Sequence, residues 1–174
     1  MSQIKVDSII PRGGLPSGAS GGIIQMKQTI RTSTFSQSIG QANESDVLCP
    51  VTITPQSSSN KILVMITGEM ALNTTHGRCF TMKRGSTSIC IGDADGSRSR
   101  RTSGGSSTNS SSPSPVVMTF LDSPSTTSTL TYGFTISHNE NGTLTVYLNR
   151  TDSDTNGSHI ARYASTCTVM EVST

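Results

Sequence analysis

The sequence lacks tryptophan, and only 4% of its 174 residues are aromatic. It is also poor in charge, because 14% of the residues are charged and the formal net charge is +2. A balance this close to neutral does not indicate a nucleic-acid partner, since such partners select strongly basic surfaces. No apolar run approaches the roughly 20 residues of a membrane span, and the N-terminus lacks the continuous apolar stretch of a signal peptide. These absences favour a soluble protein that is made in a cytoplasm and does not insert into a membrane.

The four cysteines are far apart and form no Cys-x-x-Cys pair. Each lies in or beside a strand-like run, so we expect buried free thiols that behave as small hydrophobes. His76 and Cys79 have the spacing of two zinc ligands, but the sequence offers no second pair at a suitable spacing. The "DADG" stretch at 93–96 resembles the start of a calcium loop without the glutamate that such a loop needs further on. We therefore expect no metal and no cofactor.

Serine and threonine, by contrast, make up about a third of the chain, which is typical of a β-rich protein with polar faces. After residue 22, apolar and polar residues alternate with period two in short runs, and no run has the 3.6-residue period of a helix. The runs cover 23–35, 49–55, 60–72, 78–84, 86–92, 115–122, 128–137, 142–151 and 165–172. They predict a single all-β domain, a jelly-roll β-sandwich of about eight to nine strands.

Turn residues specify some of the connections between these runs. Gly85 in "KRGSTS" predicts a tight hairpin, and Asn141-Gly142 predicts a second hairpin between the strands on either side. Two stretches lack alternation, a long Ser/Gly-rich loop at 92–115 and a shorter one at 152–161. Loops of this kind are where binding residues tend to be carried.

Two runs suggest that the chain forms an oligomer. The run at 60–72 is apolar on both of its sides, so we expect both faces to be buried, either in a deep core or at a subunit interface. The last run, at 165–172, has mixed faces and lies at the extreme terminus, where a free strand normally frays. Its composition fits a strand in the middle of a sheet that faces a symmetry axis. The candidate interface residues are Cys167, Val169 and Met170.

The chain begins with the short alternating segment "IKVDSII", which a Gly- and Pro-rich stretch separates from the first long run. We expect residues 1–22 to form an extended N-terminal anchor and linker, and residues 23–174 to form the head. An isolated strand is stable only when it is paired, so this segment should pair with another protein or with its own copies. The linker would let the head adapt to the geometry of the binding site. The candidate anchoring residues are Ile4, Val6, Ile9 and Ile10.

Residues in two regions are candidates for contact with an external surface. Arg98, Arg100 and Arg101 lie in the Ser/Gly-rich loop, where they could touch an anionic glycan, lipopolysaccharide or an acidic capsid surface. The alternative is a solvated basic run without a ligand. Tyr163, beside the second loop, is the one aromatic candidate for ligand contact, and packing at an interface is its alternative role.

Several stretches, taken in order, resemble a known family. They are "KILVMITGEM", "FTMKRGSTSICIGDADGSR", "MTFLDSPSTTSTLTYGF", "YLNRT" and "STCTVMEV". The chain resembles small structural proteins of tailed bacteriophages, especially marine and cyanobacterial ones, in which an N-terminal "IKVDSI…SG" segment precedes a jelly-roll head similar to the trimeric TNF/C1q type. The resemblance covers about residues 22–172, and its most specific stretches are "DSPSTTSTLTY" at 122–132, "NR" at 149–150 and the "TVMEV" ending.

The resemblance implies a virion component, namely a homotrimeric tail-fibre, knob or capsid-decoration protein that is attached by its N-terminus. The expected partners are its own copies, another virion protein bound through the N-terminal arm, and a host cell-surface glycan. The family brings no catalytic motif, and the sequence has no G-x-S-x-G turn and no paired carboxylates, so we expect no enzyme. Two alternatives stay open: a carbohydrate-binding module that recognises the host envelope, and a polysaccharide depolymerase.

Overall fold

The computed structural model describes residues 22–74, 77–105, 113–158 and 160–174. These residues contain no apolar helix of membrane-spanning length. Eleven strands are present: β1 (Ile23–Arg31), β2 (Phe35–Gly40), β3 (Leu48–Ile53), β4 (Lys61–Leu72), β5 (Arg78–Arg84), β6 (Thr87–Ile89), β7 (Ser103–Gly105), β8 (Ser114–Asp122), β9 (Leu130–His138), β10 (Thr143–Leu148) and β11 (Ser165–Val172).

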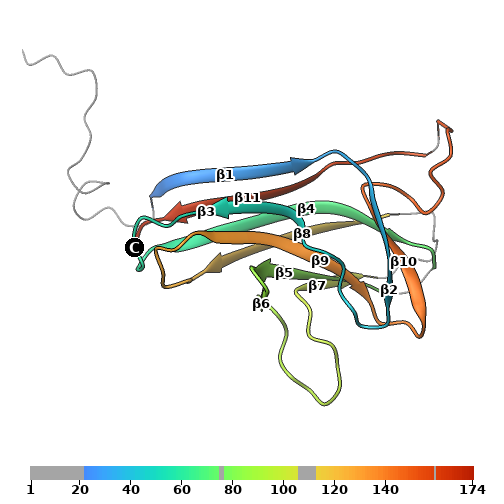
Figure 1. Ribbon diagram of the computed structural model, residues 1–174, viewed down its shortest axis with the longest axis horizontal. Coiled ribbons are helices and arrows are strands. Elements are labelled where there is room, and N and C mark those ends of the chain that lie inside the picture. The colour runs from blue at the N-terminus through green and yellow to red at the C-terminus, as the bar shows by residue number, and fades with distance from the viewer. Residues whose placement is uncertain (1–21, 75–76, 106–112, 159) are drawn as a thin grey trace, which may run out of the picture.

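The strands form two antiparallel sheets that pack face to face (Figure 1). The first, called the β4 sheet below, has the order β1-β11-β4-β10-β2, and β8 pairs with the opposite side of β4. The second, called the β9 sheet, has the order β3-β9-β5-β6, with β7 paired to β5. The expected all-β sandwich is therefore confirmed. It contains two more strands than the alternation predicted.

The two extra strands, β2 and β7, lie in segments poor in apolar residues. In β2 only Ile39 is buried, so its sequence has little alternation to detect. β7 is the tripeptide Ser-Gly-Gly within the stretch predicted as a loop. A Cβ on Gly104 would meet the carbonyl oxygen of Arg78 at 3.0 Å, so glycine is what allows this strand to approach β5.

The two predicted hairpins have different outcomes. The first is confirmed, because β5 pairs with β6 around Gly85, which has a φ of +57°. The second, at Asn141-Gly142, is wrong. Gly142 has the φ of +85° that a tight turn requires, but β9 pairs with β3 and β5 while β10 pairs with β2 and β4. This turn therefore carries the chain from one sheet to the other.

The core lies between the sheets, and β4 shows how the alternation builds it. Ile62, Val64 and Ile66 are fully buried, whereas Leu63 is half-buried and Met65 is 41% exposed. The expectation that both faces of this strand are buried is thus wrong for the single chain. The β9 sheet covers only the inner face of the β4 sheet, because a sandwich of two sheets leaves the outer face of each sheet open to solvent.

Three of the four cysteines follow the expectation of buried free thiols. Cys49, Cys79 and Cys167 are buried and free, whereas Cys90, just after β6, is free and exposed. Burial raises the pKa of Cys167 to about 12 and also raises the pKa of the other two buried thiols. These three side chains therefore pack as uncharged hydrophobes at neutral pH.

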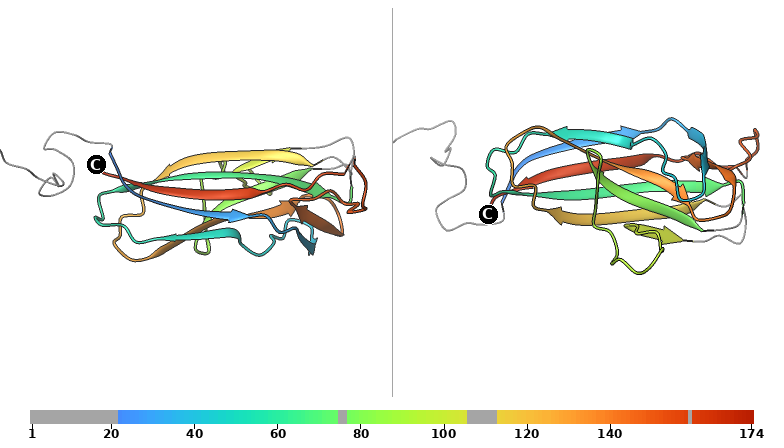
Figure 2. Two further views of the ribbon diagram at one scale, coloured as in Figure 1. Left: turned by 90° about the horizontal axis from the view of Figure 1, so that it is seen from above. Right: turned by 60° about the horizontal axis from the view of Figure 1, so that its bottom comes forward.

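The sandwich is elongated, and its two ends differ (Figures 1 and 2). β1 begins and β11 ends at one end, where the backbone N–H of Ser173 donates to the carbonyl oxygen of Gly22. The connection from β10 to β11, described for residues 149–158 and 160–164, lies at the opposite end, which is called the distal end below. Residues 90–102, between β6 and β7, project sideways from the sandwich and are called the lateral loop.

Candidate functional site

The outer face of the β4 sheet is an exposed apolar surface. The strand register places Met26, Met170, Leu63 and Leu121 opposite one another across β1, β11, β4 and β8. Directly opposed residues of adjacent strands lie on the same face, so these side chains form one row. Val117, further along β8, is the most exposed large hydrophobic residue of the described chain, at 73%. This surface, called the apolar face below, consists of Met26, Ile30, Leu63, Met65, Val117, Leu121 and Met170.

The polar side chains between these residues are bonded to one another. Gln28 donates to the hydroxyl of Thr168 at 2.7 Å, and the hydroxyls of Thr67 and Thr166 are 2.8 Å apart. Only two outer positions of β4 carry charge, namely Lys61 at its start and Glu69 near its end, before Leu72. Because these polar groups already have hydrogen-bond partners, removing water from this surface costs little free energy.

The structure corrects two of the three candidate interface residues. β11 does lie in the middle of a sheet, between β1 and β4. However, Cys167 and Val169 are fully buried between the two sheets, so they are core residues and the prediction was wrong for them. Met170 has the opposite orientation because side chains alternate along a strand. It belongs to the apolar face, where a second subunit can reach it.

Arg101 in the lateral loop is a structural residue. Its Nη1 lies 2.7 Å from a carboxylate oxygen of Glu44, whose other oxygen lies 2.5 Å from Nζ of Lys83. Burial opposes the charge of Glu44, but the hydrogen bonds and positive charges around it, from Lys83 and Arg101 among others, together outweigh burial and lower the pKa of this carboxyl. The side chain of Arg101 is only 15% exposed and also donates to the carbonyl oxygen of Ala42. It fastens the lateral loop to the sandwich, and its assignment as a surface-contact residue was wrong.

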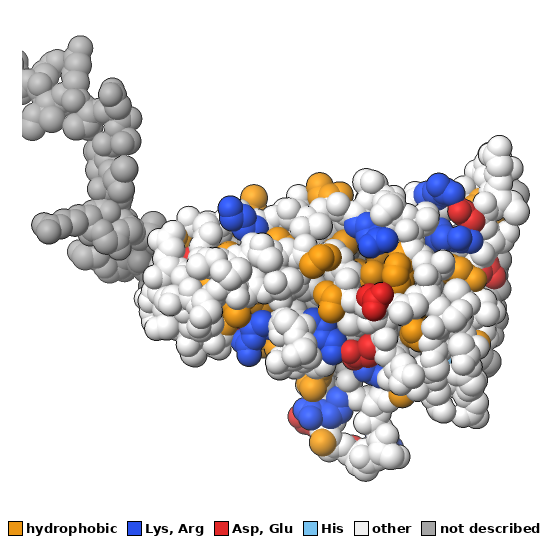
Figure 3. All heavy atoms as spheres, viewed as in Figure 1, with side chains coloured by type: hydrophobic (Ala, Val, Ile, Leu, Met, Phe, Trp, Pro, Cys, Tyr) orange, Lys and Arg blue, Asp and Glu red, His pale blue; other side chains and the backbone are white. Residues whose placement is uncertain are grey.

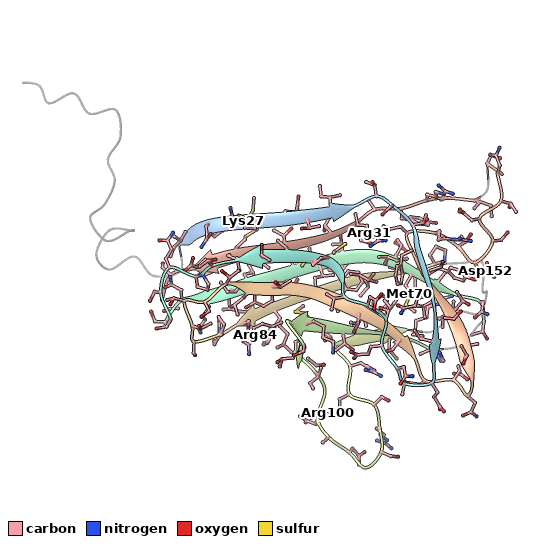
Figure 4. All side chains as sticks on the ribbon, viewed as in Figure 1. Lys27, Arg31, Met70, Arg84, Arg100 and Asp152 are labelled. Carbon is pink, nitrogen blue, oxygen red and sulfur yellow. The ribbon has the colours of Figure 1, made fainter. Side chains whose placement is uncertain are left out.

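The other two arginines of the basic run remain exposed on the lateral loop. Nη1 of Arg98 lies 2.5 Å from Oδ2 of Asp95, and the two side chains are 81% and 69% exposed. Nε of Arg100 donates to the carbonyl oxygen of Gly92 at 2.6 Å, and its position on the loop is labelled in Figure 4. Both side chains are therefore accessible to an external partner.

Arg98 also lines a hollow between the lateral loop and the connections that precede β3 and β10. This site, called the lateral hollow below, has a volume of about 550 Å³. The Nε2 of Gln41 donates to the backbone oxygen of Asn139 at 2.9 Å and joins the two connections. Sequence reasoning missed Gln41 and Asn139, because only the topology brings these distant positions together. The lining residues are Gln41, Ala42, Ser97, Arg98, Ser99 and Asn139.

A second hollow, of about 410 Å³, lies at the distal end. Arg162 donates two hydrogen bonds to the carboxylate of Asp154, at 3.0 and 2.6 Å. Charged side chains of both signs gather at this end in Figure 3. Tyr163 is half-buried, and its backbone N–H donates to the carbonyl oxygen of Asn149. The hollow is lined by Asp154, Thr155, Asn156, Gly157, Ile160 and Arg162, so it includes the neighbour of Tyr163 but not Tyr163 itself.

The stretches that carry the family resemblance contribute buried polar groups. Asp122 and Tyr132, the two ends of "DSPSTTSTLTY", meet inside the sandwich, where the tyrosine hydroxyl donates to Oδ2 at 2.7 Å. Arg84 donates to both oxygens of the same carboxylate, at 3.0 and 2.8 Å. Burial raises the pKa of Tyr132, and the bond to the aspartate raises it further. Asn149 and Glu171, from the other two stretches, are also fully buried.

Arg78 is a further buried charge that sequence reasoning missed. Its side chain is fully buried, and Nη1 donates to the hydroxyl of Ser114 at 2.5 Å. Burial lowers its pKa, and the carboxylate of Asp152, labelled at the distal end in Figure 4, acts in the opposite direction. The guanidinium thus lies between β5 and β8 and closes the distal end of the core.

The described residues contain no group of three or more His, Cys, Asp or Glu that could hold a metal ion. His138 is fully buried, with Nε2 2.9 Å from the carbonyl oxygen of Ile39. His76 and the predicted anchoring residues Ile4, Val6, Ile9 and Ile10 lie outside the described residues.

The apolar face and the two polar hollows are thus the candidate interaction sites of the described residues of the head. No model of a known protein family matches the chain, and no curated protein sequence matches it.

Proposed function

We propose that the protein is a non-enzymatic structural component of a bacteriophage virion, a homotrimeric tail-fibre, knob or capsid-decoration protein. Its N-terminal arm binds the particle, and its head is exposed to the surroundings. The observation that carries this proposal is the apolar face. A contiguous exposed apolar surface on a head with polar loops is typical of a protein–protein contact. Copies of the same chain are the partners that the family resemblance favours.

The topology supports a jelly roll as the finer description of the sandwich. The chain passes from one sheet to the other at six of its ten connections, including β3 to β4, β4 to β5 and β8 to β9. The neighbours in each sheet are therefore distant in sequence, as β1 and β11 or β3 and β9 illustrate. Jelly rolls are double-sheet folds built from such Greek-key connections.

The location of the apolar face supports a trimer with its three-fold axis along the sandwich. The strands that carry the face run the length of the head, from the end where β1 begins toward the distal end (Figure 1). Rotation about an axis parallel to these strands brings three β1 N-termini to the same end. The three arms can then bind one particle site together, and weak contacts of the three heads add through multivalency.

A carbohydrate-binding module that recognises the host envelope is the second candidate function. The two polar hollows favour it, because saccharide hydroxyls need closely spaced donors and acceptors such as those of Asp154, Arg162 and Asn156. The two functions are compatible, since a virion head that binds a glycan would perform both.

The replacement Val117→Asp tests the interface. Light scattering of the wild-type protein should give about three times the mass of the 18.3 kDa chain. The variant should give the mass of one chain, because a carboxylate without a partner is costly to bury in an interface. Val117 is exposed in the single chain, so the variant should keep its β-sheet circular dichroism spectrum. Thr52→Asp, at an exposed position on β3, is the matched control and should remain trimeric. A wild-type monomer would refute the interface, and a wild-type dimer would refute the trimer.

A further inference from the structure

We propose that the lateral hollow binds a carboxylate-bearing sugar residue of an acidic polysaccharide. Its volume of about 550 Å³ falls within the range of roughly 300–1,000 Å³ that is typical of ligand sites. None of its lining residues belongs to the apolar face, so the proposed oligomer contact leaves these residues unused. The role of the site in host adsorption rests on the proposed virion function, whereas the binding itself does not.

Arg98 supplies the group that recognises the carboxylate. A guanidinium presents a planar pair of donors that matches the two oxygens of a carboxylate. Its present partner is the carboxylate of Asp95 in the same loop, and both side chains are mostly exposed. Exposed ion pairs contribute little to stability because water competes for both partners. A ligand carboxylate can therefore replace Asp95 at small cost.

The other lining residues suit hydroxyl groups. Gln41 and Asn139 each carry an amide with donors and an acceptor, and Ser97 and Ser99 add hydroxyls that can act in either role. The bond from Nε2 of Gln41 to the backbone of Asn139 holds the glutamine side chain in place. The Nδ2 of Asn139 contacts Sγ of Cys79 at 3.4 Å, which restricts the second amide. The donors and acceptors are thus partly fixed before a ligand arrives.

The chemistry of the lining favours a sugar over other anionic ligands. The residues that line the hollow include no aromatic side chain, so a nucleic-acid base would find no aromatic ring to stack on. Ala42 is the only apolar residue in the lining, so an acidic peptide would find little apolar surface for its side chains. An acidic sugar needs neither, because it presents one carboxylate and several hydroxyls.

The test is an NMR titration of the full ¹⁵N-labelled chain with two probes, methyl D-galacturonoside and methyl D-galactoside, which differ in the carboxylate. The acidic sugar should bind about ten-fold more tightly, because a charge-assisted bidentate contact is among the stronger polar interactions. Arg98→Gln should remove this difference. Arg100→Gln is the matched control, because it removes an exposed arginine of the same loop that does not line the hollow. Asp95→Asn should tighten binding of the acidic sugar, because it removes the internal competitor.

Equal binding of the two sugars would overturn the proposal, and so would equal effects of the Arg98 and Arg100 variants. Binding of a glutamate-rich peptide in place of the acidic sugar would show that the site docks protein and would overturn it as well. Light scattering on the same samples separates the two proposals. A monomer that binds the acidic sugar would support the sugar site and refute the proposed trimer. A trimer that does not bind it refutes the site alone.

Discussion

At the scale of single residues, buried polar side chains hold the loops of this sandwich in place. The fully buried carboxylate of Glu171 accepts hydrogen bonds from Nδ2 of Asn60 at 2.6 Å, from the backbone N–H of Gln56 at 2.7 Å and from Nε2 of Gln25 at 2.6 Å. It thereby joins β11 to β1 and to the connection between β3 and β4, at the end where β1 begins. Burial raises the pKa of this carboxyl, but these hydrogen bonds outweigh burial and lower it below the ordinary value.

Glu171→Gln should therefore destabilise the head at neutral pH. Hydrogen bonds to a charged group contribute more than those to a neutral one, so we expect a loss of about 1–3 kcal/mol in the free energy of unfolding. Since the pKa is lowered in the folded state, the stabilisation is complete above the ordinary pKa of 4.5 and is lost as the pH falls below it. Urea unfolding at pH 7 and at successively lower pH should show the difference between wild type and variant shrinking in acid.

Glu69 is the matched control for this prediction. Burial alone raises the pKa of its carboxyl, and none of the described residues forms an ion pair or hydrogen bond with that carboxylate. Glu69→Gln should leave the free energy of unfolding at pH 7 unchanged or slightly raised, because burial disfavours its charged form. Equal losses for the two variants would contradict the role assigned to Glu171.

The sequence could locate these residues but could not assign their roles. Asp122, Asn149 and Glu171 all lie in the stretches that carry the family resemblance. Their partners are 10, 118 and 111 positions away, as the bonds to Tyr132, Arg31 and Asn60 show. A pattern of local alternation contains no information about such long-range pairs, so the roles appear only once the chain is folded.

At the scale of elements, alternation predicted strands well and their pairing poorly. The runs at 78–84 and 165–172 coincide with β5 and β11, because each has one apolar face that must turn toward the core. The turn at Asn141-Gly142 was predicted to pair the strands beside it, yet β9 and β10 lie in different sheets. A turn signal fixes the local backbone, whereas burial of both strands' apolar faces decides which sheet each one joins. The lateral hollow was missed for the same reason.

The end of β10 offers a test at this scale. Asn149 has a φ of +60°, donates from Nδ2 to the carbonyl oxygens of Arg31 and Ser33, and accepts a hydrogen bond from Ser165 at 2.6 Å. It thus joins the ends of β1, β10 and β11. Asn149→Ala loses these bonds and adds strain, because a Cβ without a polar group disfavours positive φ.

Asn149→Ala should lower the free energy of unfolding by about 2–4 kcal/mol. Asn149→Gly loses the same hydrogen bonds without the backbone strain, so it should be about 1 kcal/mol more stable than Asn149→Ala. Asn156→Ala, at an exposed position of the same connection, is the control and should change the free energy by less than about 0.5 kcal/mol. Urea unfolding of the three variants and the wild type gives the order of their free energies of unfolding. Equal stabilities of the alanine and glycine variants would show that positive φ carries no strain here.

At the scale of the whole molecule, the head has a direction. β1 begins at one end, the distal hollow lies at the opposite end, and the lateral loop projects from the side (Figures 1 and 2). The basic run lies on the lateral loop and not at either end of the sandwich, because this loop connects β6 and β7, which both pair with β5. In the proposed trimer each copy would therefore present two separate polar sites, one lateral and one distal.

This arrangement predicts that attachment and folding can be separated. Deletion of residues 1–10 should leave a head with an unchanged melting temperature and trimeric mass, because β1 begins only at Ile23 and its hydrogen bonds lie within the sandwich. The same deletion should abolish incorporation into the particle, because it removes the segment expected to pair with another virion protein. Quantitative mass spectrometry of purified particles measures incorporation. As the control, residues 1–22 fused to a fluorescent protein should join the particle without the head. Incorporation of the truncated chain at the wild-type level would show that the head, through its own surfaces, is the part that binds the virion.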